Sequence, residues 1–242
     1  MKNLLSVCVA LLVLGCVNLL PAEAVPYKWG IGLSDSKTKI PASDDGADAV
    51  ISCTVGSEEN TVVLQLESGG RKYIKFYGPN IFRLFQDPQN GVVFRSPEAK
   101  PEAQILVANP MKPVGGVKLS EENGDFVIKT PHVAITVRKQ DGAISVTNLK
   151  NGRTVMAEKS PAAISGNKVT LSLNAQPDEY FYGAGIQNGR FSHKGNVVNI
   201  VNENSWTDGG VCSPAPYYWS TNGYGFMAYT FKPGRYDFGS KD

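Results

Sequence analysis

A polar loop with a single tryptophan, residues 202–210, holds the side chains best suited to chemistry in this sequence. It contains Glu203, Asn204, Trp206 and Asp208 and ends in two glycines. An indole ring can stack on the apolar face of a pyranose, while amide and carboxylate groups bond to its hydroxyl groups. The loop is therefore a candidate sugar-binding site. The alternative is that Trp206 and Trp219 pack as core aromatics and the polar residues serve turns.

Two histidines offer acid and base chemistry at neutral pH. His132 stands at the head of an alternating strand, and His193 lies in the loop 190–195. A shared catalytic role requires that the two side chains meet in space, a requirement that spacing along the chain does not test. The alternative is two unconnected structural or surface histidines.

Three glycines after a predicted strand, Gly183, Gly185 and Gly189, resemble a nucleotide-binding loop at first sight. A dinucleotide fingerprint places its third glycine three positions after the second and a helix behind it. Here the third glycine comes four positions later, and the chain leads towards another strand. We therefore expect these glycines to mark positive φ angles or close backbone approaches. No cofactor is predicted.

Charge and cysteine content exclude other classes. Lys plus Arg number 24 and Asp plus Glu number 22, so the net charge of +2 is too small for nucleic acid to be an expected partner. Beyond the first 24 residues only Cys53 and Cys212 remain, without the paired spacing of a zinc site, so no metal site is predicted. The two cysteines form either one disulfide or two separate buried thiols.

The first 24 residues have the pattern of a secretory signal. Lys2 precedes an apolar stretch from Leu4 to Leu20, and Ala22-Glu23-Ala24 forms a cleavage site. The protein is therefore expected in the periplasm or outside the cell, without a stable membrane span. Two alternatives are a short membrane anchor and a lipoprotein attached at Cys16.

The rest of the chain predicts a leading arm, residues 25–48, followed by an all-β domain, residues 49–242. The clearest unit is a hairpin over 133–148 that turns at Asp141-Gly142, with a second turn at Asn151-Gly152. Regular turns at this spacing favour a sandwich or barrel. Further strands are predicted at 50–55, 61–66, 72–76, 81–85, 105–107, 154–156, 169–173, 180–182, 197–201, 217–220 and 226–231.

The run from Glu179 to Phe191, EYFYGAGIQNGRF, resembles the N-terminal β-sandwich of glycoside hydrolase family 31. The hairpin over 133–148 and the later run from Pro216 to Gly225, PYYWSTNGYG, share this resemblance. Together the motifs extend in order over roughly residues 50–238, and the signal and arm are similar to those of bacterial members.

This resemblance implies a galactose-mutarotase-like antiparallel sandwich that precedes a catalytic (β/α)₈ barrel. Family members are retaining exo-acting α-glucosidases, α-xylosidases and relatives, which use two carboxyl groups about 5 Å apart. In the family both are barrel aspartates, and no matching motif occurs in these 242 residues. The chain is therefore expected to be a non-catalytic domain, truncated before the barrel and without the last strands of the sandwich, whose partners are that barrel and an α-linked oligosaccharide.

The resemblance also assigns a role to the tryptophan loop. In the family a sandwich loop, usually with an Asn-Arg-Asp sequence, reaches the barrel mouth and shapes the sugar subsites, and here Asn202, Glu203 and Asn204 hold that place. Asn204, Trp206 and Asp208, with Glu203 as a further candidate, are thus expected to form a rim of the substrate pocket. The alternatives are a stand-alone carbohydrate-binding module and an aldose mutarotase-like enzyme.

Overall fold

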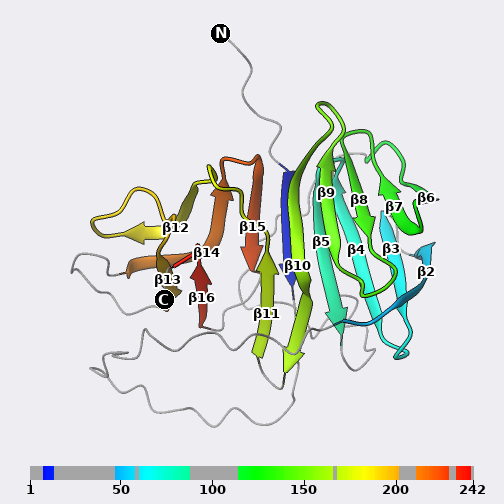
Figure 1. Ribbon diagram of the computed structural model, residues 1–242, viewed down its shortest axis with the longest axis horizontal. Coiled ribbons are helices and arrows are strands. Elements are labelled where there is room, and N and C mark those ends of the chain that lie inside the picture. Colours follow the sequence, from blue (N-terminus) through cyan, green and yellow to red (C-terminus); the bar gives the residue numbers. More distant parts are fainter. Residues whose placement is uncertain are drawn as a thin grey trace.

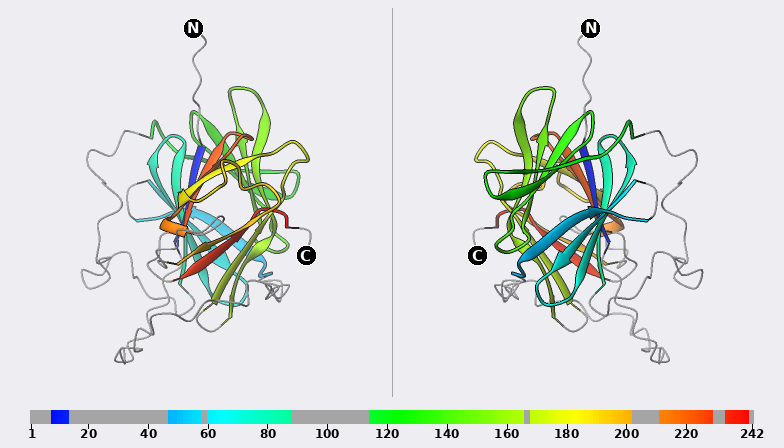
Figure 2. Two further views of the ribbon diagram at one scale, coloured as in Figure 1. Left: turned by 90° about the vertical axis from the view of Figure 1, so that its left-hand side faces the viewer. Right: turned by 90° about the vertical axis from the view of Figure 1, so that its right-hand side faces the viewer.

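The computed structural model describes residues 8–13, 47–57, 60–87, 114–165, 168–201, 211–228 and 233–240. Every regular element within these ranges is a β-strand, so the all-β prediction is confirmed. Two large sheets form separate layers (Figures 1 and 2), and a small third sheet pairs β13 (Val197–Ile200) with β16 (Gly234–Asp237). No helix in the described ranges has the length and apolar character needed to cross a membrane.

The six-stranded sheet is an antiparallel meander in which each strand pairs with the next along the chain. Its centre is the predicted hairpin, where Gly142 adopts a φ of 76° in the first turn and Gly152 a φ of 69° in the second. Residues other than glycine are strained at positive φ angles, which explains why glycine occupies both turns. The strands are β6 (Lys118–Glu122), β7 (Asp125–Lys129), β8 (Val133–Val137), β9 (Ile144–Asn148), β10 (Arg153–Ser165) and β11 (Lys168–Leu173).

The eight-stranded sheet joins two groups of strands from opposite ends of the chain. One group is the hairpin series β2 (Val50–Val55), β3 (Thr61–Leu66), β4 (Arg71–Gly78) and β5 (Ile81–Asp87). The other is β12 (Phe181–Gln187), β14 (Val211–Ser220) and β15 (Tyr224–Ala228). Between β5 and β15 lies β1 (Cys8–Val13), drawn in blue in Figure 1. The order across the sheet is β12-β14-β15-β1-β5-β4-β3-β2.

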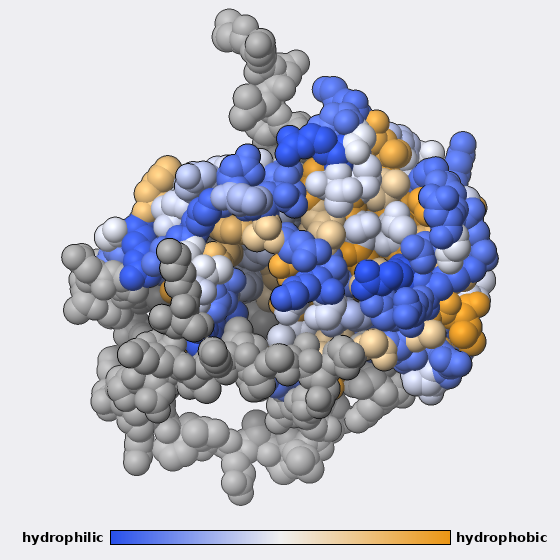
Figure 3. Space-filling model, in the orientation of Figure 1, coloured by the Kyte–Doolittle hydropathy of each residue, from blue (hydrophilic) through white to orange (hydrophobic). Residues whose placement is uncertain are grey.

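The core lies between the two large sheets. Alternate residues of β3 and β4, such as Leu64, Ile74 and Phe76, are fully buried, as are Ile128 and Ile135 of the other sheet. Alternation with a period of two places these side chains on the inner faces. Hydrophilic residues cover most of the outer face of the six-stranded sheet, whereas apolar residues gather along the edge formed by β2, where Ile51 is 61% exposed (Figure 3).

Two opposite charges are buried within this core. Lys72 of β4 donates from Nζ to the carbonyl of Gly142 at 3.5 Å, and Glu158 of β10 accepts from the backbone N–H of Ile144 at 2.8 Å. Burial lowers the pKa of Lys72, against the opposing effect of the Glu158 charge. Burial raises the pKa of Glu158 to about 7, partly offset by the Ile144 hydrogen bond and the Lys72 charge.

The raised pKa of Glu158 predicts a specific pH dependence of stability. The ordinary pKa of a glutamate is 4.5, and that of Glu158 in the folded protein is about 7, so between these pH values the folded state binds more protons than the unfolded state. The protonated Glu158 therefore contributes fully to stability at low pH, and this contribution is lost as the pH rises from 4.5 to 7. Relative to Glu158→Gln, the unaltered chain should lose about 2.5 kcal/mol of unfolding free energy between pH 5 and pH 8. Urea denaturation across that range measures the difference. The exposed Glu122→Gln is the control, and equal slopes for the unaltered chain and Glu158→Gln would contradict the prediction.

Most of the predicted strands are confirmed, and four strands were not predicted. β2 and β3 have the predicted bounds, whereas β1, β6, β7 and β16 were missed. The predicted strand at 105–107 and most of the arm lie outside the described residues. The end of the arm joins the domain, because the backbone N–H of Asp48 donates to the carbonyl of Asp141 at 3.1 Å.

Candidate functional site

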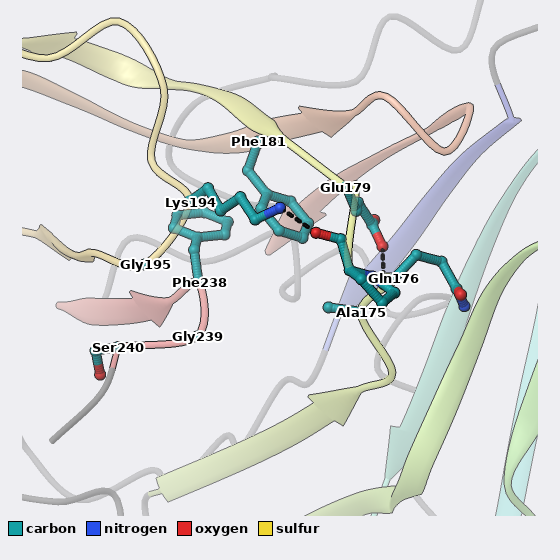
Figure 4. Close-up of a pocket in the computed structure, with 10 residues that line it drawn as sticks. Ala175, Gln176, Glu179, Phe181, Lys194, Gly195, Phe238, Gly239 and Ser240 are labelled. Atoms are coloured by element: carbon teal, nitrogen blue, oxygen red, sulfur yellow. Dashed lines mark hydrogen bonds between the residues drawn. The ribbon is translucent and has the colours of Figure 1, made fainter.

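A pocket of about 570 Å³ opens where three segments meet near one end of the eight-stranded sheet. The segment before β12, the loop between β12 and β13, and the turn after β16 form its walls (Figure 4). It combines aromatic rings with a carboxylate and an ammonium group. The lining residues are Ala175, Gln176, Pro177, Glu179, Phe181, Lys194, Gly195, Phe238, Gly239 and Ser240.

Glu179 is the buried acid of the pocket, and its oxygens are already engaged. One oxygen accepts from the backbone N–H of Gln176 at 2.9 Å, and the other accepts a hydrogen bond from the hydroxyl of Ser220 on β14. Burial raises the pKa of Tyr224, and the negative charge of Glu179 raises it further. Only 2% of Glu179 is exposed. It therefore fixes the entry of β12 to the β14–β15 turn.

Lys194 closes the other side of the pocket. Its ammonium group points towards the segment before β12 (Figure 4) and donates to the carbonyl of Pro177. It also lies 4.5 Å from the ring centroid of Tyr180. A cation over an aromatic face gains about 0.5–1 kcal/mol at an exposed site. The lysine thus ties the β12–β13 loop to the segment before β12.

His193 has a structural role beside this pocket. Its Nε2 lies 2.9 Å from the carbonyl of Gly183, and its ring stacks on Phe238 with centroids 5.6 Å apart. Because a carbonyl only accepts, Nε2 carries the proton, and the buried Nδ1 has no hydrogen-bond partner among the described residues. His132 is exposed in the turn before β8, in the other sheet, so no described contact joins the two histidines. The structure favours the interpretation of two unconnected histidines.

The glycines of β12 allow a tight backbone approach, as predicted. Gly183, Ala184 and Gly185 all have positive φ angles, of 106°, 59° and 86°, and the β12–β14 register shifts at this point. A β-carbon on Gly185 would lie 2.0 Å from the carbonyl oxygen of Ser213. Gly189 has a φ of 71°. The bulge determines where the residues on either side of it point.

One of these residues, Tyr182, belongs to an exposed aromatic ridge with Trp219 and Phe191. The Tyr182 and Trp219 rings stack with centroids 4.5 Å apart and planes 25° apart, and Phe191 meets Tyr182 edge-on at 5.3 Å. Trp219 is 43% exposed and Phe191 88% exposed. Trp219 is therefore not a core aromatic. Stacking covers one face of each of these two rings.

The predicted rim residues Glu203, Asn204, Trp206 and Asp208 lie outside the described residues, so their role stays a prediction. Cys53 is a free thiol whose burial raises its pKa to about 11. Its strand, β2, is separated from the strand of Cys212 by five strands of the sheet, whereas a disulfide requires α-carbons within about 7 Å. The structure therefore favours separate thiols over the disulfide.

The pocket can hold a polar ligand, but it lacks a pair of groups for acid–base hydrolysis. Among its described lining residues Glu179 is the single carboxylate, and retaining glycosidases use two. No cluster of three metal-ligating side chains occurs in the described part of the chain. The sequence did not predict this pocket, because its walls come from three separate segments. The one available signal was that Glu179 begins the run that resembles the family and Lys194 follows three residues after its end.

Two mainly antiparallel sheets packed around a shared core, with the bulged β12 at one edge, define a galactose mutarotase-like β-sandwich. The profile of the glycosyl hydrolase 31 N-terminal galactose mutarotase-like domain matches residues 73–237. The chain belongs to this family. Among curated protein sequences, none matches this one.

Solved structures of longer enzymes share the fold. A glycoside hydrolase family 31 dextranase from Flavobacterium johnsoniae, complexed with glucose, superposes with a TM-score of 0.69 at 16% identity over 81% of this chain and 24% of that one. The cycloalternan-forming enzyme from Listeria monocytogenes, in complex with a pentasaccharide substrate, gives 0.60 at 16% identity over 81% and 18%. The chain thus spans about a quarter or less of these enzymes.

Proposed function

We propose that this chain is the non-catalytic N-terminal domain of an exported, retaining exo-α-glycosidase that hydrolyses terminal α-glucosides or α-xylosides. The observation that supports this proposal is the family match over residues 73–237, in a chain that spans 24% of the dextranase. The two carboxyl groups of hydrolysis would then belong to the catalytic barrel. The role of this domain would be to position the loop 202–210 at the rim of the substrate pocket.

Activity assays on the chain and on the full gene product test this function. We expect the full product to hydrolyse maltose, isomaltose or an aryl α-xyloside, and residues 25–242 alone to hydrolyse none of them. A full product without activity on any α-glycoside would contradict the proposal.

The aromatic ridge favours a second candidate, a carbohydrate-binding module, because exposed tryptophan and tyrosine rings often contact sugars. Calorimetry of residues 25–242 with maltose and isomaltose separates the two functions. Sugar binding that is lost in Trp219→Ala would support the module, whereas no binding agrees with the domain role. Polarimetry of α-glucose with the same preparation tests the mutarotase alternative.

The rim role of the loop predicts an effect of Trp206→Ala in the full enzyme. Loss of a ring stacked on a sugar should remove about 1.4 kcal/mol of transition-state binding, which is a tenfold fall in kcat/KM. Trp206→Phe keeps an aromatic face and should recover most of the loss. The measurement is kcat/KM on several α-glycosides, and an unchanged value for Trp206→Ala on all of them would exclude the rim role.

A further inference from the structure

β1 differs from every other described strand of the two large sheets because it runs parallel to both of its neighbours. It runs parallel to β5, with Val9 to Val13 opposite Ile81 to Phe85, and parallel to β15, with Cys8 to Leu12 opposite Tyr224 to Ala228. All other described strand pairs are antiparallel. Consequently β5 and β15, which lie on either side of β1, run in the same direction.

This arrangement fits a different strand better than it fits β1. From β2 to β5 the strands alternate in direction, and they alternate again from β15 through β14 to β12. A single strand antiparallel to both β5 and β15 would make the alternation unbroken across all eight positions. Purely antiparallel sheets are over-represented among natural sheets, and antiparallel pairs are slightly more stable per residue than parallel pairs.

The position between β5 and β15 cannot stay empty without a large loss of stability. It lies in the middle of the sheet, where Phe82, Leu84 and Phe226 are buried in the core on either side of it. Removal of the predicted signal, residues 1–24, would take β1 away and leave facing backbone groups of both strands without partners. Each buried polar group left in this way costs about 1–3 kcal/mol.

We propose that in the exported protein this position is held by another strand, antiparallel to β5 and β15, which comes from the same polypeptide outside residues 1–242. The inference rests on the proposed function, because it requires a longer enzyme. The occupant must place an apolar residue level with Phe82 and Phe226, which share one register position, and another apolar residue level with Leu84.

The same polypeptide is favoured over a second molecule as the source of this strand. The matching dextranase is about four times as long as the part that this chain covers, so such a protein has ample further sequence. A segment tethered to the domain also has an effective concentration in the millimolar range, which a separate copy reaches only at very high protein concentration.

The processed protein, purified from the cell that makes it, gives a direct test. N-terminal sequencing establishes whether residues 8–13 are present, and hydrogen exchange measures the protection of residues 81–85 and 224–228. We expect residues 8–13 to be absent and these amides to exchange at least about a hundredfold more slowly than the outward-facing amides of the edge strand β2. Retention of residues 8–13 in the sheet, or exchange as fast as at β2, would overturn the proposal.

Photo-crosslinking then identifies the occupant and its direction. A benzophenone side chain is placed at position 81 and, in a separate protein, at position 85, and captured peptides are identified by mass spectrometry. For an antiparallel strand, the residue captured from position 81 follows the one captured from position 85 along the chain. The reverse order, capture within residues 1–242 other than β4, or capture from an isotopically labelled second copy would each contradict the proposal.

Hydrolysis of α-glycosides by the same preparation is measured separately, so that the two proposals fail in different ways. An active enzyme whose central position is open contradicts only the strand proposal. A filled position in a protein without glycosidase activity contradicts only the proposed function.

Discussion

Gly185→Ala should lower the free energy of unfolding by at least about 3 kcal/mol. The φ of Gly185 is +86°, and an added β-carbon would lie 2.0 Å from the Ser213 carbonyl oxygen and 2.6 Å from the backbone nitrogen of Ala215. These are backbone atoms of β14, so no side chain can rotate away. The β12–β14 pair must separate locally, which removes hydrogen bonds of the ladder. Urea denaturation of the variant measures the loss.

Gly152→Ala is the matched control for this substitution. Gly152 also has a positive φ, of +69°, but apart from its two chain neighbours no described residue lies within 4 Å of its would-be β-carbon. It reports the conformational strain alone, which is about 1–2 kcal/mol for a non-glycine residue. Equal losses for the two variants would show that the close approach of β12 to β14 contributes nothing.

Glu179→Ala should destabilise the domain by about 3 kcal/mol, because one buried donor and one partly buried donor lose their acceptor. These donors are the hydroxyl of Ser220 and the backbone N–H of Gln176. Thermal or urea denaturation measures the change. The neighbouring Asp178 is exposed, so Asp178→Ala should change stability by no more than about 0.5 kcal/mol. A Glu179→Ala variant as stable as Asp178→Ala would show that the pocket acid does not anchor β12.

Glu179→Gln refines this result. The amide oxygen can still accept one of the two hydrogen bonds, so we expect an intermediate loss of stability. Because Glu179→Gln should lose less stability than Glu179→Ala, it is the better variant to use in the full enzyme. There it would test whether the pocket contributes to activity separately from stability.

The parts of the fold that the sequence predicts are those with strong local signals. The hairpin over 133–148 has alternating apolar residues and an Asp-Gly turn, and both signals act within a few residues of each other. Positive φ angles or close backbone approaches were also predicted at the glycines of β12, because glycine is favoured at such positions. In contrast, β6 is exposed at most positions, and β16 is only four residues long, so neither has an alternating apolar pattern.

The candidate site is less predictable because it depends on segments that are far apart in the chain. Glu179 meets Ser220 across the sheet, and Phe181 lies 4.9 Å from Phe238, measured between ring centroids. Neither contact follows from spacing along the sequence. The alternative interpretation, that Trp219 packs in the core, failed for a related reason. Its neighbour Tyr218 points inward instead, and alternation along β14 then places Trp219 outside.

The strand order also has a consequence for how the domain folds. Strands β2 to β5, and likewise β6 to β11, pair with their immediate neighbours in the chain, so each group can form from short-range contacts. Joining β5 to the β12–β15 group requires residues from opposite ends of the domain to meet, and such long-range closure is slow. The last event in folding should therefore be the closure of the eight-stranded sheet at its centre. Until that event, the two partial sheets have exposed edges that can pair with other chains.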